Sequence, residues 1–155
     1  MEILKGDIVE KASLGEFDVL IYPCTCFHLP TNLQGKKIRD TFTQARIIDK
    51  QTKKGDHNKL GCYSKAIVDL REIDYKIKRK LIVINAYLYY SNNLPLFEYK
   101  YLEYVLKLIK EKYTGKSIAL PIIGYGNKDI SQDRIFQIIE KELENEKVFI
   151  VVNAE

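Results

Sequence analysis

The sequence contains few of the residues that cross-link or interrupt a small fold. Its 155 residues include three cysteines, four prolines and no tryptophan. Three cysteines cannot build the disulfide framework of a small secreted domain. No apolar run approaches the roughly 20 residues that span a bilayer, and the first residues lack the apolar stretch of a signal peptide. We therefore expect a cytoplasmic protein without a membrane partner.

The three cysteines do not indicate a metal centre. Cys24 and Cys26 are two positions apart and would share one side of a strand, while Cys62 is distant. Zinc usually takes four ligands, and adding His28 and His57 gives a spacing that fits no standard zinc motif. We interpret the cysteines as reduced, partly buried thiols, and we predict neither a metal nor a cofactor.

The small positive charge excess gives little information about partners. The formal net charge is +4, and the densest basic run covers residues 76–80. This run precedes an apolar strand, which favours a solvated turn over a nucleic-acid patch. We therefore expect no nucleic-acid partner. A basic stripe assembled from several elements stays an alternative, and a steep loss of affinity with salt would reveal it.

Length and composition predict one folded domain covering residues 1–155. Hydrophobic residues make up 46% and charged residues 30%, as in ordinary globular proteins. Several short apolar runs are mostly continuous rather than alternating, which is typical of strands covered on both faces. These predicted strands are residues 17–22, 66–70, 81–86, 117–122 and 148–152.

Helical spacing separates the predicted strands. Residues 99–113 and 131–143 each carry one apolar stripe, with Ser131 as a candidate N-cap of the second helix. A third helix is predicted to start near Thr31 or Asn32, with Leu33, Ile38, Phe42 and Ala45 on its apolar stripe. The alternation of strands and helices indicates an α/β fold, with helices on both faces of a mixed sheet.

Three loops lie where ligands bind in such folds, beyond the carboxyl ends of strands. Residues 121–127 contain a Gly-Tyr-Gly turn before a helix, which could direct N–H groups at an anion. Residues 23–28 place small and polar side chains after a strand. Residues 5–8 contain a Gly-Asp turn, whose carboxylate could accept a hydrogen bond from an exocyclic amine. Taken one at a time, each loop also fits an ordinary turn.

Together these segments resemble a macrodomain along nearly the whole chain. Residues 3–8, Ile-Leu-Lys-Gly-Asp-Ile, are similar to the family's Gly-Asp-Ile opening. Residues 55–61, Gly-Asp-His-Asn-Lys-Leu-Gly, resemble the Gly-Asp-x-x-Lys-Leu-Gly stretch of compact bacterial and phage members. Residues 84–87, Ile-Asn-Ala-Tyr, match the next strand end of that branch, and residues 120–126, Leu-Pro-Ile-Ile-Gly-Tyr-Gly, match its second phosphate loop.

The resemblance implies a mostly parallel mixed sheet with ADP-ribose in a cleft at the strand ends. In that reading Asp7 contacts the adenine amine, Ile8 lines the adenine pocket, and the segment around Tyr125 wraps the distal phosphate and ribose. The partner would be an ADP-ribose-like small molecule or an ADP-ribosylated target. The predicted ligand-binding residues are Asp7, Ile8, Cys24, Thr25, Thr31, Asn32, Leu33, Gln34, Gly35, Lys36, Ile123, Gly124, Tyr125, Gly126 and Asn127.

The sequence departs from the family pattern at the positions linked with catalysis. Thr25 stands where active members have the asparagine that holds the distal ribose. Residues 31–35, Thr-Asn-Leu-Gln-Gly, replace the family's Gly-Ala-Gly-Ile-Ala, so Cβ atoms would crowd a diphosphate. Ser131 replaces an acidic residue linked with catalysis in some members, and nearby Asp129 is the candidate substitute.

These departures favour binding with weak or no catalysis. If the source is a phage, capture of an ADP-ribose-derived defence signal would be one use. The first alternative is a phosphatase acting on ADP-ribose 1″-phosphate, or an ADP-ribosyl hydrolase, with Asp129 or His28 as general base. The second alternative is a protein-interaction module whose pocket is closed by the bulk of Leu33 and Tyr125.

Overall fold

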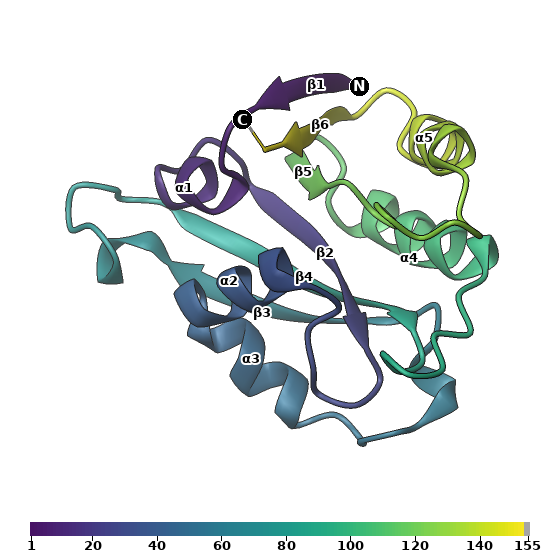
Figure 1. Ribbon diagram of the computed structural model, residues 1–155. Coiled ribbons are helices and arrows are strands. Elements are labelled where there is room, and N and C mark those ends of the chain that lie inside the picture. The colour runs from purple at the N-terminus through teal and green to yellow at the C-terminus, as the bar shows by residue number, and fades with distance from the viewer. Residues whose placement is uncertain (154–155) are drawn as a thin grey trace.

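The computed structural model, which describes residues 1–153, has a six-stranded sheet between two helical layers (Figure 1). The strands are ordered β1-β6-β5-β2-β4-β3, and only the β3–β4 pair is antiparallel. Their bounds are β1 Glu2–Lys5, β2 Val19–Thr25, β3 Tyr63–Asp69, β4 Lys80–Tyr89, β5 Ser117–Pro121 and β6 Lys147–Val152. The predicted α/β fold with a mixed, mostly parallel sheet is confirmed.

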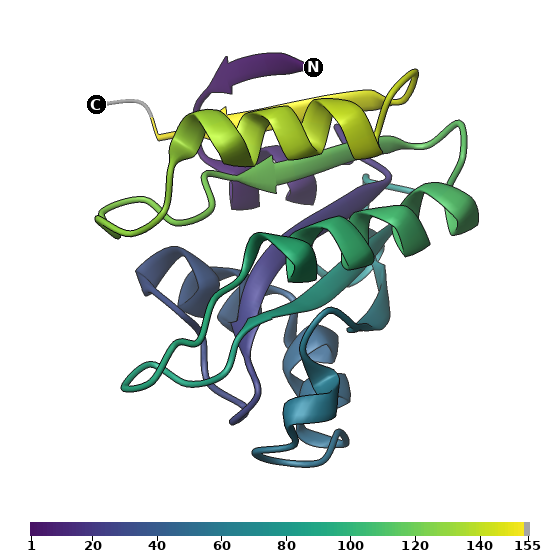
Figure 2. The ribbon, with the colours of Figure 1, turned by 90° about the vertical axis from the view of Figure 1, so that its right-hand side faces the viewer.

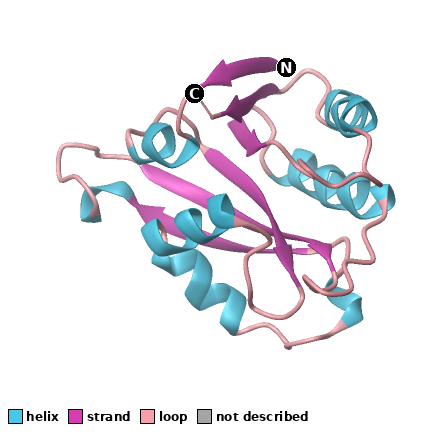
Figure 3. Ribbon diagram, in the orientation of Figure 1, coloured by secondary structure: helices cyan, strands magenta, loops and turns pink. Residues whose placement is uncertain are grey.

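Helices cover both faces of the sheet (Figure 3). One layer holds α1 (Ile8–Ser13), α2 (Leu33–Thr41) and α3 (Thr43–Lys50), while the other holds α4 (Tyr99–Lys112) and α5 (Gln132–Glu142). Short 3₁₀ turns lie at His57–Lys59 and Leu70–Glu72. Figure 2 shows α4 and α5 side by side over their face of the sheet.

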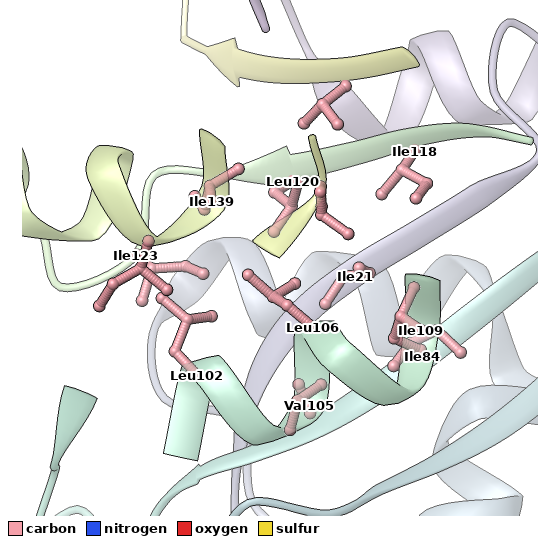
Figure 4. Packing of buried hydrophobic residues seen from close by; sticks show 14 of the residues in the cluster. Ile21, Ile84, Leu102, Val105, Leu106, Ile109, Ile118, Leu120, Ile123 and Ile139 are labelled. Carbon is pink, nitrogen blue, oxygen red and sulfur yellow. The ribbon is translucent and has the colours of Figure 1, made fainter. Parts of the chain in front are cut away.

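Continuous apolar strands supply both cores because the central strands are covered twice. Every residue of β2 is buried, and alternate residues face opposite layers. Ile21 packs with Leu106 and Ile109 of α4 (Figure 4), and Val19 belongs to the same cluster. Leu20 and Tyr22 instead face α1, α2 and α3.

Several predicted elements have other bounds in the structure: β3 begins at Tyr63 and β4 ends at Tyr89, each three residues beyond the prediction. The single helix expected from Thr31 or Asn32 to Ala45 is two helices, because Phe42 leaves helical geometry at φ −104° and ψ 75° and inserts its ring into the core. Strand β2 extends to Thr25, beyond the expected end at Tyr22, because the long β4 offers pairing partners to its last three residues. The capped helix α1 was not predicted from the sequence.

A buried ion pair joins α2 to α3. Arg39 donates from Nη1 to Asp49 Oδ2 at 2.7 Å, and both residues are almost completely buried. The Tyr87 hydroxyl of β4 donates to Asp49 Oδ1 at 2.7 Å. Burial raises the pKa of Tyr87, which keeps this donor protonated. Both carboxylate oxygens of Asp49 therefore have a hydrogen-bond donor.

Asn85 extends this polar network across the sheet. Its Oδ1 accepts from the Tyr22 hydroxyl at 2.5 Å, and its Nδ2 donates to Ala45 O at 2.9 Å and to Ser64 Oγ at 3.0 Å. Because an unpaired polar group in this core would be costly, the network permits few other positions of α2 and α3.

We expect Asp49→Asn to destabilise the fold strongly, because it leaves the Arg39 charge buried without its counter-charge. The expected loss is about 3–5 kcal/mol in the free energy of unfolding, measured by chemical denaturation. Asp40→Asn is the matched control, because Asp40 forms an exposed pair with Lys36 and its loss should cost under about 1 kcal/mol. Equal losses in the two variants would contradict the assigned role of the buried pair.

Candidate functional site

A cleft of about 710 Å³ opens beyond the carboxyl ends of β1, β5 and β6. Its volume is within the range of small-molecule sites, and its position is the one where parallel sheets bind ligands. Three carboxamide side chains, one lysine and five apolar or aromatic residues line it. These are Lys5, Asn32, Leu33, Gln34, Ile122, Tyr125, Val151, Val152 and Asn153.

The N-terminus of α2 forms one wall of the cleft. Asn32 is the N-cap, and its Oδ1 accepts from Gly35 N at 2.8 Å. The first N–H groups of a helix have no acceptor inside the helix, and they carry its partial positive charge. The backbone of Leu33 and Gln34 therefore brings anion-binding character to this wall.

The loop between β5 and α5 forms the facing wall. Gly124 and Gly126 have φ values of 77° and 79°, which residues with a Cβ rarely adopt. A Cβ on Gly124 would lie 2.7 Å from Ile130 Cγ2. The loop is anchored from inside the fold, because the Gln132 side chain donates to Ile123 O at 2.7 Å. The close approach of Ile130 and the hydrogen bond from Gln132 therefore fix the position of this glycine turn.

The two bulky residues of these walls do not fill the cleft. Leu33 and Tyr125 line it, yet each is 84% exposed. Their side chains extend into solvent rather than packing into the interior. The prediction that Leu33 and Tyr125 close the pocket by their bulk is therefore wrong for this structure.

Asp7 is already engaged on both carboxylate oxygens. Oδ1 accepts from Val9 N and Glu10 N at 2.9 and 3.1 Å and so caps α1, while Oδ2 pairs with Lys37 Nζ of α2. The Lys37 hydrogen bond is the main cause of a lowered Asp7 pKa. Neighbouring Ile8 is fully buried in the core and does not line the cleft.

The segment after β2 is closed by its own hydrogen bonds. The Thr25 hydroxyl donates to Leu29 O at 3.0 Å and accepts from Phe27 N at 3.2 Å. Cys24 is buried, and that burial raises its pKa to about 12. Neither Thr25 nor Cys24 lines the cleft.

The two candidate catalytic residues lie outside the cleft lining. His28 has a φ of 64°, and its Nε2 donates to Thr52 O at 2.8 Å, so this ring atom serves the fold. Asp129 is exposed, and its backbone N–H donates to Asn127 Oδ1 at 3.1 Å. The structure does not bring His28 and Asp129 together at the cleft.

Of the predicted binding residues, four line the cleft: Asn32, Leu33, Gln34 and Tyr125. Gly35 is buried within α2, and Lys36 pairs with Asp40 at 2.7 Å. Of the remaining predicted positions, Thr31, Ile123, Gly124 and Gly126 directly adjoin lining residues, and Asn127 lies two positions after Tyr125.

Five lining residues are absent from the predicted binding residues, although Lys5 and Ile122 lie within the predicted loops 5–8 and 121–127. Lys5 and Val152 are register partners at the parallel β1–β6 pair, and Val151 and Asn153 adjoin them on β6. Ile122 directly follows β5. The carboxyl ends of parallel strands meet at one edge of a sheet, and this rule could have identified these residues. It could not be applied, because the local sequence does not show that the first strand pairs with the last.

The cysteines and histidines form no metal centre within residues 1–153. All three cysteines are free, and no group of three His, Cys, Asp or Glu side chains in this part of the chain could hold an ion. The basic run 76–80 is largely exposed in the turn before β4. No helix in the described residues has the length and apolar character to cross a membrane.

Solved structures with the same arrangement of helices and strands identify the fold. The macrodomain of Thermus aquaticus DarG aligns over 99% of this chain and 97% of its own, with a TM-score of 0.66 and 19% identity. The chain has a macrodomain fold. No protein-family model and no curated sequence matches it.

Two further structures show how widely this macrodomain fold extends. A protein of unknown function from Bacteroides thetaiotaomicron aligns over 98% of both chains, with a TM-score of 0.70 and 20% identity. Thermosipho africanus DarTG, solved in complex with ADP-ribose, aligns over 98% of this chain and 42% of its own, with a TM-score of 0.73 and 13% identity.

We expect Lys37→Met to raise the Asp7 pKa, because it removes the charged donor that favours the carboxylate. NMR titration of the Asp7 carboxyl carbon measures the change. The lowered pKa stabilises the wild-type fold above the ordinary carboxyl value, and this contribution is lost as pH falls through the lowered pKa. An Asp7 titration curve that does not move in Lys37→Met would show that the pair does not form in solution.

Proposed function

We propose that this macrodomain binds ADP-ribose or a related ADP-ribose-derived nucleotide in the cleft, with weak or no catalysis. The observation that carries the proposal is the cleft between the α2 N-terminus and the Gly124–Gly126 turn. Helix N-termini and glycine turns are the usual backbone elements for binding phosphate. The ADP-ribose complex of the DarTG structure supports the same ligand class.

The chemistry of the lining matches the parts of such a ligand. Ile122, Val151 and Val152 offer an apolar surface to an adenine ring, and Asn153 offers donors and acceptors beside it. The α2 N-terminus adjoins this surface, where Gln34 Nε2 donates to Asn153 Oδ1 at 3.5 Å, and it would face the diphosphate, with Lys5 adding positive charge. Asp7 can contact the adenine amine only by sharing the carboxylate with Lys37.

Several contacts support binding over turnover. The Thr25 hydroxyl is used twice within its own loop, so it is not available to hold the distal ribose. His28 Nε2 is bound to Thr52 O, which removes that atom as a free general base. Asp129 remains the one exposed candidate for activating water.

Isothermal titration with ADP-ribose tests the proposal directly, with an expected Kd of roughly 1 μM, or about −8 kcal/mol. We expect Gly124→Ala to weaken binding about tenfold, equivalent to about 1.4 kcal/mol, because its Cβ would push against Ile130 and move the glycine turn.

Gly115→Ala is the matched control for this variant. Gly115 also has a positive φ, at 84°, but lies in the turn before β5 with no atom within 4 Å of the added Cβ. Both variants should lose about 1–2 kcal/mol of stability from backbone strain, whereas only Gly124→Ala should lose affinity. A wild-type protein that binds no ADP-ribose would overturn the proposal.

The enzyme alternative is tested by incubating the protein with ADP-ribose 1″-phosphate and measuring released phosphate. We expect no release above that of a heat-inactivated sample, because no free general base lies at the cleft. Release that disappears in Asp129→Asn, with ADP-ribose affinity retained, would establish a phosphatase and assign Asp129 as its base.

A further inference from the structure

Residues 55–61, the Gly-Asp-His-Asn-Lys-Leu-Gly segment, contribute no residue to the cleft. The segment instead presents Lys59 to the interior. Asp56 caps the short turn His57–Lys59 by accepting from Asn58 N at 2.9 Å. Gly61, at φ 81°, donates to Tyr87 O at 3.0 Å and leaves space for the ring of Tyr104. These contacts within residues 55–61 thus fix the position of Lys59.

Lys59 is a buried cation without a buried acid of its own. It is 8% exposed, and its Nζ donates to Cys26 O at 3.0 Å and to Thr52 Oγ1 at 2.8 Å. The ammonium also lies 4.8 Å from the centre of the Tyr87 ring. No carboxylate within residues 1–153 forms an ion pair with it. Burying a charged ammonium without an acidic partner costs free energy. We therefore expect Lys59 to have a role that a neutral side chain would not fill.

Lys59 and Arg39 both donate hydrogen bonds to carbonyl oxygens of the segment after β2. Lys59 binds the carbonyl oxygen of Cys26, and Gly55 N donates to the same oxygen at 2.7 Å. Arg39 donates from Nη2 to His28 O at 3.2 Å. Two buried cations thus hold the carbonyl oxygens of Cys26 and His28, the residues on either side of Phe27.

This held segment leads directly into the cleft wall. Residues 26–32 connect β2 to α2 and end at Asn32, the N-cap that lines the cleft. Pro30 is bridged to Cys24, and the Asn92 side chain donates to Pro30 O at 3.2 Å. Since the segment is fastened at its start, middle and end, its geometry sets the direction of the first N–H groups of α2.

We propose that Lys59 is a positioning residue for the anion-binding wall of the cleft, acting through the carbonyl oxygen of Cys26. The proposal rests on the proposed function for its ligand, an ADP-ribose-like diphosphate. In this role the ammonium fixes the β2–α2 segment through its hydrogen bond to Cys26 O. Residues 55–61 then place the Lys59 ammonium beside the carbonyl oxygen of Cys26.

The experiment compares Lys59→Met and Lys59→Arg with wild type in titrations with ADP-ribose and with adenosine. Lys59→Met should weaken ADP-ribose binding about tenfold, because hydrogen bonds to a charged group are lost, and leave adenosine binding within twofold. Lys59→Arg keeps the charge and should recover most of the affinity. Lys53→Met, at an exposed lysine just before residues 55–61, is the control and should bind like wild type.

A merely structural lysine would give another pattern. If Lys59→Met binds ADP-ribose as wild type does, or if it loses ADP-ribose and adenosine affinity equally, the positioning role is overturned. Thr52→Val removes one acceptor of the ammonium and keeps the charge, so it provides a milder second variant if Lys59→Met fails to fold. It should weaken ADP-ribose binding by a smaller factor in the same direction, and unchanged binding in that variant would also count against the role.

Hydrogen exchange separates failure of this inference from failure of the proposed function. If the wild-type protein binds no ADP-ribose, the amides of residues 26–32 still report on positioning in the free protein. Faster exchange there in Lys59→Met or Thr52→Val, with unchanged exchange in β4, would support the role of Lys59. Unchanged exchange in residues 26–32 would overturn it.

Discussion

The buried contact between Arg39 and Asp49 is the interaction on which the arrangement of this macrodomain fold depends most directly. It links α2 to α3, and through Tyr87 it links both helices to the central strand β4. A charge pair in such a place is tolerated only when each hydrogen-bonding position is filled. That requirement fixes α2 relative to the sheet, and the N-terminus of α2 is a wall of the cleft.

The two facing walls of the cleft are therefore backbone segments that distant side chains hold in place. Its α2 wall depends on the cap at Asn32 and on the segment that Arg39 and Lys59 hold from inside. Its other wall depends on a glycine turn anchored through Gln132. Backbone N–H groups can bind phosphate without a particular side chain, so under the proposed function the α2 wall needs a fixed backbone more than particular side chains.

Catalysis has stricter requirements than binding, because it needs specific side chains at specific atoms. Here the hydroxyl of Thr25 and the Nε2 atom of His28 are both used by the fold. Both groups stabilise the segment around β2 and α2. Under the proposed function, these contacts favour binding over turnover.

The sequence by itself determined the fold class, since continuous apolar strands alternating with helical stripes permit few arrangements, and its ordered motifs pointed to the macrodomain. It also placed Asn32, Leu33, Gln34 and Tyr125 at the site. It did not reveal the break at Phe42, the contribution of β6 to the cleft, or the exposure of Leu33 and Tyr125. Only the tertiary structure decided these, because each depends on contacts between segments far apart in the chain. The contacts of Lys59 also join segments that are apart in the chain. From the local sequence alone, a lysine in a turn is expected to be solvated.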